Sequence, residues 1–200
     1  MNKRYSIIMA VWVLLCCVNL YAENIDPYED GSQYAYGENV GWLNFEPSQG
    51  PGVQVSSSVV QGFVWAENIG WINLSPASYG GVVNDGAGNL SGFAWAENVG
   101  WINFGPGYGG VTIDENGNFA GWAWGENIGW INFNSAQLFD KGVRACKVSF
   151  DDLANFADDW LKMDPASPAN LISPAGVDGT DYAAFASYWR DFCPEGWELK

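Results

Sequence analysis

Apolar and polar positions alternate in short runs from residue 34 to residue 135, and glycine- and asparagine-rich turns separate the runs. A period of two is typical of β-strands with one buried face. The stretch "VTIDENGNFAGWAWGENIGWINF", residues 111–133, contains one turn at Asn116-Gly117 and a second at Glu126-Asn127. The pattern therefore predicts three short strands joined by two hairpins.

Four copies of this unit follow one another. Their Gly-Trp pairs end at Trp42, Trp71, Trp101 and Trp130. A period of about 30 residues indicates a repeat protein whose units bury their faces against their neighbours. We expect a mainly β fold of four three-stranded meanders. An open stack is preferred, because both faces of each unit carry apolar residues, with a barrel or a propeller as alternatives. The first unit lacks its opening strand and would form an end.

Hairpin loops decide which side chains share a face, because directly opposed residues point to the same side of a sheet. Loops with an even number of residues would give each unit one core face and one mixed face. The core faces would contain Val111, Ile113, Trp122, Trp124, Ile131 and Phe133 in the fourth unit, and Phe93, Trp95, Ile102 and Phe104 in the third. The mixed face of the fourth unit would contain Thr112, Asp114, Phe119, Gly121, Ala123, Trp130 and Asn132.

The mixed face supplies the candidate binding residues, one tryptophan and one asparagine per unit, two positions apart. They are Trp42, Asn44, Trp71, Asn73, Trp101, Asn103, Trp130 and Asn132. Four bare indoles would expose about 800 Å², more than a soluble monomer usually tolerates. Either the next repeat covers them, or they stay open as flat platforms on which sugar rings stack beside amide groups. A protein partner is the third alternative.

The Glu-Asn turns recur at 38–39, 67–68, 97–98 and 126–127. Asparagine tolerates the left-handed conformation of a tight turn, and the glutamate can face water. A solvated turn is therefore expected, although stacked carboxylates are also oxygen ligands for a divalent cation.

Charge and composition exclude several classes of function. The chain has 23 acidic and eight basic residues, a formal charge of -15, and no histidine. No lysine or arginine occurs between Glu23 and Asp140. Nucleic acid and anionic membrane surfaces are therefore not expected as partners. The commonest general base and metal ligand is missing.

Residues 1–22 have the pattern of a secretory signal peptide, with a basic start, an apolar run at 7–18 and a cleavage site at Ala22. A retained anchor and lipidation at Cys16 or Cys17 are the alternatives. The run is too short for a comfortable membrane span, so no span is expected after cleavage. The mature chain keeps six basic residues, a formal charge of -17. It also keeps Cys146 and Cys193, an even pair that indicates a disulfide rather than two free thiols.

Helical spacing replaces alternation after Ser135, which divides the chain into a signal peptide at 1–22, a repeat domain at 23–138 and a helical tail at 139–200. Two similar segments of the tail predict a small α-helical hairpin, with Ser149 or Asp151 capping the first helix and Thr180 the second. The predicted apolar stripes are Leu153, Phe156, Ala157, Trp160 and Leu161, and Tyr182, Phe185, Ala186 and Trp189.

The doubled pattern Asp-(Leu/Tyr)-Ala-x-Phe-Ala-x-x-Trp resembles the helix pairs of dockerin-like modules at the C-termini of secreted bacterial proteins. The resemblance implies a calcium-binding loop before each helix, with Asn170, Asp178 and Asp181 as candidate ligands. Lys141, Ile172 and Pro174 stand where that family places ligands, so neither calcium nor another cofactor is expected. The "GFAWAENVGWINF" units resemble a tandem repeat of exported bacterial proteins, which implies a compartment but no chemistry.

These observations predict a non-enzymatic structural or interaction protein at the bacterial cell exterior, secreted or surface-bound, with a protein or a polysaccharide as partner. The alternative is a carbohydrate-binding module that uses the Trp and Asn rows. A two-carboxylate glycoside hydrolase is the least favoured function, because repeated acids share like environments whereas catalysis needs unlike ones. No catalytic residue is assigned.

Overall fold

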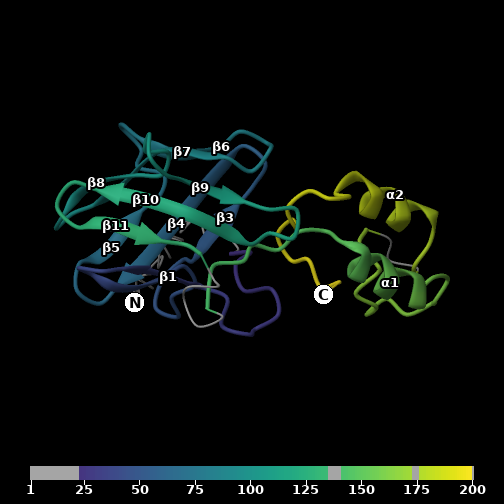
Figure 1. Ribbon diagram of the computed structural model, residues 1–200. Coiled ribbons are helices and arrows are strands. Elements are labelled where there is room, and N and C mark those ends of the chain that lie inside the picture. The colour runs from purple at the N-terminus through teal and green to yellow at the C-terminus, as the bar shows by residue number, and fades with distance from the viewer. Residues whose placement is uncertain (1–22, 135–140, 173–175, 200) are drawn as a thin grey trace, which may run out of the picture.

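The computed structural model describes residues 23–134, 141–172 and 176–199, so the predicted signal peptide lies outside the described residues. Eleven strands form one body, and two helices lie beyond one end of it (Figure 1). The elements are β1 (Tyr34–Gly37), β2 (Gly41–Asn44), β3 (Val53–Val55), β4 (Val59–Ala66), β5 (Gly70–Asn73), β6 (Gly81–Asn84), β7 (Leu90–Ala96), β8 (Gly100–Asn103), β9 (Gly110–Ile113), β10 (Phe119–Gly125), β11 (Gly129–Asn132), α1 (Phe150–Asp158) and α2 (Gly179–Ser187).

The sheet closes into an eight-stranded antiparallel barrel. Four hairpins, β1–β2, β4–β5, β7–β8 and β10–β11, stand side by side around it, and we number them 1 to 4. The last strand, β11, pairs with β1 through Tyr36 opposite Asn132 and Gly37 opposite Ile131. The structure therefore shows the barrel alternative and not the preferred open stack. Closure satisfies the strand edges that an open array would leave unpaired.

The short strands β3, β6 and β9 extend the barrel by pairing with the first halves of β4, β7 and β10. Residues 143–145 complete this extension, because Val143 bridges Gln33 and Arg144 bridges Asn118. The chain that follows the last hairpin thus occupies the place of the opening strand that the first unit lacks. The prediction that the first unit forms an end is therefore wrong, because this unit is a neighbour of the last.

One glycine in each long strand allows the chain to pass from one level of the barrel to the other. Gly62, Gly92 and Gly121 all have a positive φ, +106°, +88° and +90°. A Cβ atom on Gly121 would lie 1.9 Å from the carbonyl oxygen of Gly110. These positions therefore need glycine for both conformation and space.

Small, aliphatic and phenylalanine side chains fill the barrel, and the tryptophans lie outside it. Val111, Ile113, Ile131 and Phe133 are buried as predicted, as are Ile102 and Phe104 in the third unit. The prediction was wrong for the central strand of each unit. Phe119 and Ala123 are buried, whereas Trp122 and Trp124 in the fourth unit and Phe93 and Trp95 in the third face outwards.

Odd-numbered hairpin loops explain this inversion. Ala96 pairs with Gly100, which leaves three residues between them, and Ile113 pairs with Phe119, which leaves five. The Val99 N–H donates to the Ala96 carbonyl oxygen, and Gly100 then adopts a φ of +87°. The glycine after the loop, rather than the asparagine within it, takes the left-handed conformation. The central strand therefore turns over relative to both of its neighbours.

The helices α1 and α2 pack around Phe156 and Phe185, whose ring centroids lie 5.2 Å apart. Ser149 caps α1 as predicted, but Asp178 caps α2, and Thr180 lies within its first turn. The structure contains the predicted disulfide, between Cys146 and Cys193. No helix in the described part of the chain is long and apolar enough to span a membrane.

Candidate functional site

Three aromatic side chains from each hairpin form a cluster on the outside of the barrel, and we call the four clusters together the aromatic belt. Its members are Tyr34, Tyr36, Trp42, Phe63, Trp65, Trp71, Phe93, Trp95, Trp101, Trp122, Trp124 and Trp130. Within each hairpin two of the three rings are directly opposed across the strands. In hairpin 3 these are Trp95 and Trp101, at 4.7 Å between ring centroids and 61° between planes. The corresponding pairs lie at 4.8 to 5.0 Å.

Within the aromatic belt, the four candidate tryptophans are only partly covered. Trp42, Trp71, Trp101 and Trp130 keep 36% to 39% of their surface exposed. The edge-to-face partner in the same hairpin covers part of each ring, and the connector before the hairpin covers more, as where the Tyr79 ring lies 5.6 Å from that of Trp101. These four rings are therefore partly exposed and are not fully buried between repeats.

The candidate asparagines alternate with these rings around the barrel. Asn73 of hairpin 2 lies directly across from Trp95 of hairpin 3, and Asn44, Asn103 and Asn132 have the same register with Trp65, Trp124 and Tyr36. The Oδ1 atom of Asn73 accepts a hydrogen bond from the Ser75 N–H at 2.9 Å, which ends the strand in a turn. Within the described residues the Nδ2 groups of Asn73 and Asn103 have no acceptor, so they can donate to a ligand.

The asparagines of the Glu-Asn turns have a role that the sequence did not indicate. Asn98 Nδ2 donates to the Ile69 carbonyl oxygen of the preceding hairpin at 3.0 Å. Asn68 and Asn127 make the same bond, and Asn39 closes the ring by donating to the Ile128 carbonyl oxygen at 3.0 Å. The prediction that these asparagines serve a left-handed turn is therefore wrong. They join successive hairpins, and the adjacent glutamates remain at the surface.

Four grooves lie between successive hairpins, numbered by the hairpin that provides the Gly-Trp tryptophan. Grooves 1, 2 and 3 combine that tryptophan and its asparagine with an aromatic ring, a glutamate and an asparagine of the next hairpin. They enclose about 410, 380 and 510 Å³, and groove 4 encloses about 300 Å³. Groove 4 is lined by Glu38, Tyr108, Trp122 and Trp130, and the candidate Asn132 is buried beside it instead.

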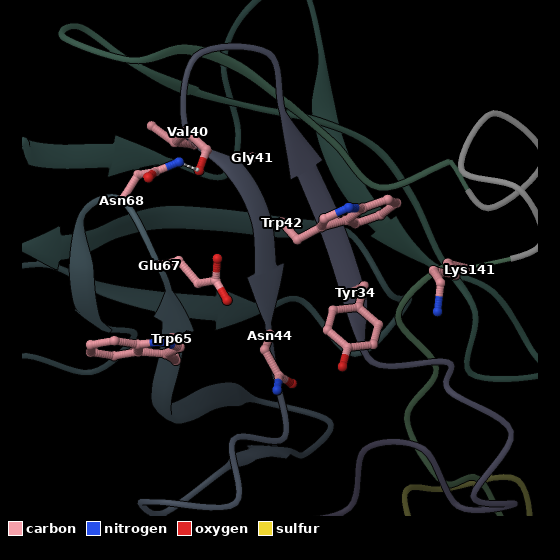
Figure 2. Close-up of a pocket in the computed structure, with 9 residues that line it drawn as sticks. All are labelled: Tyr34, Val40, Gly41, Trp42, Asn44, Trp65, Glu67, Asn68 and Lys141. Carbon is pink, nitrogen blue, oxygen red and sulfur yellow. Dashed lines mark hydrogen bonds between the residues drawn. The ribbon is translucent and has the colours of Figure 1, made fainter.

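Groove 1 illustrates the arrangement (Figure 2). The Trp42 and Trp65 rings flank the space, and the Glu67 carboxylate points into it between them. Tyr34 and Lys141 lie at the far side, where the Lys141 ammonium is 5.0 Å from the Tyr34 ring centroid. Ring faces, a carboxylate and an amide converge here, which suits a ligand with apolar C–H faces and polar edges.

The sequence prediction missed half of each groove. It assigned Trp95 and Trp124 to the core and did not consider Trp65, although each lies six positions before a candidate tryptophan and on the same face. It considered the glutamates of grooves 1 to 3 as turn residues or cation ligands, and not as part of a groove with the aromatic rings. The glycine before each candidate tryptophan was the available signal, since a left-handed glycine there implies a longer, odd-numbered loop.

Two of the three dockerin-like candidate ligands, Asp178 and Asp181, form the N-terminal cap of α2. Asp178 Oδ1 accepts the Thr180 N–H, and this hydrogen bond, together with that of the Thr180 hydroxyl, lowers the pKa of Asp178. Asp181 is fully buried and accepts the N–H groups of Ile172 and Asp178. Asn170 Nδ2 donates to the Pro165 carbonyl oxygen. In the parts of the chain that the structure describes, no three His, Cys, Asp or Glu residues are grouped as metal ligands.

Comparison of the chain with protein-family models, with characterised proteins and with solved structures returns no match.

Proposed function

We propose that this protein is a non-enzymatic, exported glycan-binding protein whose four outer grooves each seat a sugar unit. The aromatic belt supports the proposal, because it keeps four equivalent, partly exposed ring pairs on the surface of a barrel whose core is already complete without them. Exposed aromatic surface of this extent marks an interaction site. The aromatic rings alternate with polar groups, which favours a saccharide over a purely apolar partner.

The chemistry of one groove supplies both parts of sugar recognition. The C–H face of a pyranose ring would stack on the indole of Trp71, while the Asn73 amide donates to a hydroxyl and the Glu97 carboxylate accepts from one. A single sugar unit of about twelve non-hydrogen atoms would bind weakly, with a Kd on the order of 1 mM.

Repetition compensates for this weakness. A polysaccharide that engages a second groove does so intramolecularly, so that its avidity exceeds the affinity of one groove without any new type of contact. Polymers and surfaces bearing many chains are therefore expected to bind better than short oligosaccharides.

The test is a titration of the mature protein with neutral, acidic and amino-sugar polysaccharides, followed by tryptophan fluorescence and calorimetry. We expect emission to shift with at least one of them. Trp101→Ala should remove one of the four grooves from the measured stoichiometry. It should also lower the unfolding free energy by about 1 kcal/mol through the lost ring pair, in addition to the lost burial of the indole. The control is Phe150→Ala, which removes an exposed aromatic ring outside the belt and should leave binding unchanged.

The competing hypothesis, a structural spacer, expects the belt to be inert. A complete absence of binding across the three classes of glycan, with the fold intact, would contradict the proposal and leave a spacer or a protein partner.

A further inference from the structure

We infer that the grooves select an amino-sugar polymer with free ammonium groups. This inference rests on the proposed function and specifies its ligand class. It begins from the four groove glutamates, Glu38, Glu67, Glu97 and Glu126, which are all exposed. No hydrogen bond or ion pair joins their carboxylates to another described residue. The ion pairs among the described residues are Lys162–Asp159 and Arg190–Glu115.

The aromatic rings reinforce the preference of the carboxylate. An indole face has negative electrostatic potential and attracts a cation. In groove 1 the Glu67 carboxylate points into the space between two indoles (Figure 2). A ligand ammonium there would meet a formal negative charge and aromatic faces at once, while the C–H face of the same sugar ring could stack.

Groove 1 already holds an intramolecular example of this contact. The Lys141 ammonium lies over the Tyr34 ring at 5.0 Å from its centroid, at the edge of the groove. Among the described residues that line the four grooves, Lys141 is the one basic residue. Grooves 2, 3 and 4 combine aromatic rings with a carboxylate and have no such lysine, so an ammonium from outside can take the corresponding place.

The wider charge distribution favours the same class of ligand. No lysine or arginine occurs from Glu23 to Asp140, so the negative groove charges are not balanced within the barrel sequence. The resulting field attracts a polycation over about a Debye length and repels uronic acid or sulfated polymers. A neutral glycan could form the same hydrogen bonds but would leave every groove carboxylate without an ionic partner.

The experiment compares two oligomers of matched length and linkage, a glucosamine oligomer with free amines and its fully N-acetylated counterpart. Calorimetry with the mature protein should give about tenfold tighter binding of the free-amine oligomer, from one ion pair and one cation–π contact per groove. The preference should decrease with added salt. It should also decrease as pH rises and the amines lose their protons.

The variant E97Q/E126Q removes the carboxylates from grooves 2 and 3. It should reduce the number of tight sites for the free-amine oligomer, and this loss should be larger than any loss for the acetylated oligomer, because the glutamine side chain still offers an oxygen acceptor but no charge. The control variant E195Q/E198Q removes the same charge from exposed positions in the tail and should retain the preference.

Three results would overturn the inference. Equal affinity for the two oligomers would show that the grooves bind sugars without regard to charge, which leaves the proposed function standing. Equal loss of preference in the two variants would assign it to net charge rather than to the grooves. Binding of a lysine-rich peptide as tight as that of the free-amine oligomer would indicate a basic protein partner. Failure of every glycan to bind would instead contradict the proposed function itself.

Discussion

The barrel and the helical tail are both built by duplication at nearly the same period, yet they are stabilised by different means. One period of about 30 residues separates Trp71 from Trp101 in the barrel and Phe156 from Phe185 in the tail. Four copies suffice to close a ring, so every barrel hairpin has a neighbour on each side. Two helical copies have only each other, and one face of each remains without a repeat partner.

The difference appears in the size of the two cores. Among the described residues, 29 buried side chains form the barrel core, and nine form the core of the tail. A core of the smaller size rarely supplies enough stabilisation alone. The tail accordingly contains the disulfide between Cys146 and Cys193, whereas the barrel contains no cysteine.

Buried carboxylates add a second kind of cross-link to the tail. Asp152 and Asp181 occupy equivalent positions in the two helices, and each completes a capping box with the residue that precedes its helix. Each also reaches a distant segment, since Asp152 accepts the Trp197 indole N–H at 2.6 Å and Asp181 accepts the Ile172 N–H at 2.9 Å. In the closed ring one hydrogen bond repeats between all neighbouring hairpins, while the pair of helices is joined by a disulfide and by hydrogen bonds to distant segments.

Removing the disulfide should lower the free energy of unfolding more than any other change, and it should destabilise the tail alone. The bond closes a loop that spans 47 positions, for which chain entropy gives about 4 kcal/mol. Cys146→Ala/Cys193→Ala should therefore unfold α1 and α2 at low denaturant and leave the barrel transition in place. Hydrogen exchange resolved by segment measures this directly. Joint loss of protection in helices and strands would show that the two regions fold as one unit.

Gly121→Ala should cause the next largest loss of unfolding free energy, and it should destabilise the barrel alone. The new methyl group meets the Gly110 carbonyl oxygen in a left-handed conformation, at a cost of about 3 kcal/mol in unfolding free energy. Gly110→Ala shares a positive φ, +131°, but meets open space, and should cost about 1 kcal/mol. Gly107→Ala has neither problem and should be neutral. Denaturant titration of the three variants separates the clash from the backbone strain, and equal costs at 121 and 110 would refute the clash.

Asn39→Ala tests whether the junction that closes the ring of hairpins is as stable as the junctions between consecutive hairpins. Asn39 joins the first hairpin to the last, and Asn98 makes the equivalent bond between consecutive hairpins, at the same 3.0 Å. Loss of either neutral hydrogen bond should lower the unfolding free energy by about 1 kcal/mol. Asn116→Ala, at an exposed loop position, provides the control. A much smaller cost for Asn39→Ala than for Asn98→Ala would identify the closing seam as a weak point.

The sequence predicted the elements of this molecule better than their orientation. Alternation located the strands, and helical spacing located α1 and α2 with Phe156 and Phe185 at their contact. Local periodicity does not report whether the first and last repeats meet, because pairing of β1 with β11 joins residues about 95 positions apart in the chain. The barrel could therefore be an alternative but not the preferred arrangement.

The candidate site was half predicted for a related reason. Trp101 and Asn103 were placed on the mixed face, away from the core, and both lie outside the barrel, whereas Trp95 was placed in the core wrongly. A single residue in a hairpin loop exchanges the two faces of the next strand. Composition offered an independent check, since Ala94 and Ala96 fit the narrow interior where the ring of Trp95 could not.

Lowering the pH should remove a small stabilising contribution from the cap of α2 and leave the cap residue of α1 unchanged. Asp178 caps α2, and hydrogen bonds from the Thr180 hydroxyl and N–H hold its pKa below the ordinary 3.8, against the weaker opposing influences of desolvation and of Asp181. Because the folded-state pKa is the lower one, the carboxylate stabilises the tail above pH 3.8, and this contribution disappears as pH falls through the folded-state value. Ser149, the cap of α1, does not titrate in this range.

Asp178→Ser gives α2 the same kind of cap as α1, so the variant should match the parent protein near neutral pH. In denaturant titrations followed by far-UV circular dichroism, it should lose less stability than the parent as the pH is lowered below 3.8. Identical acid profiles for the two proteins would place the acid sensitivity of the tail elsewhere than at this cap.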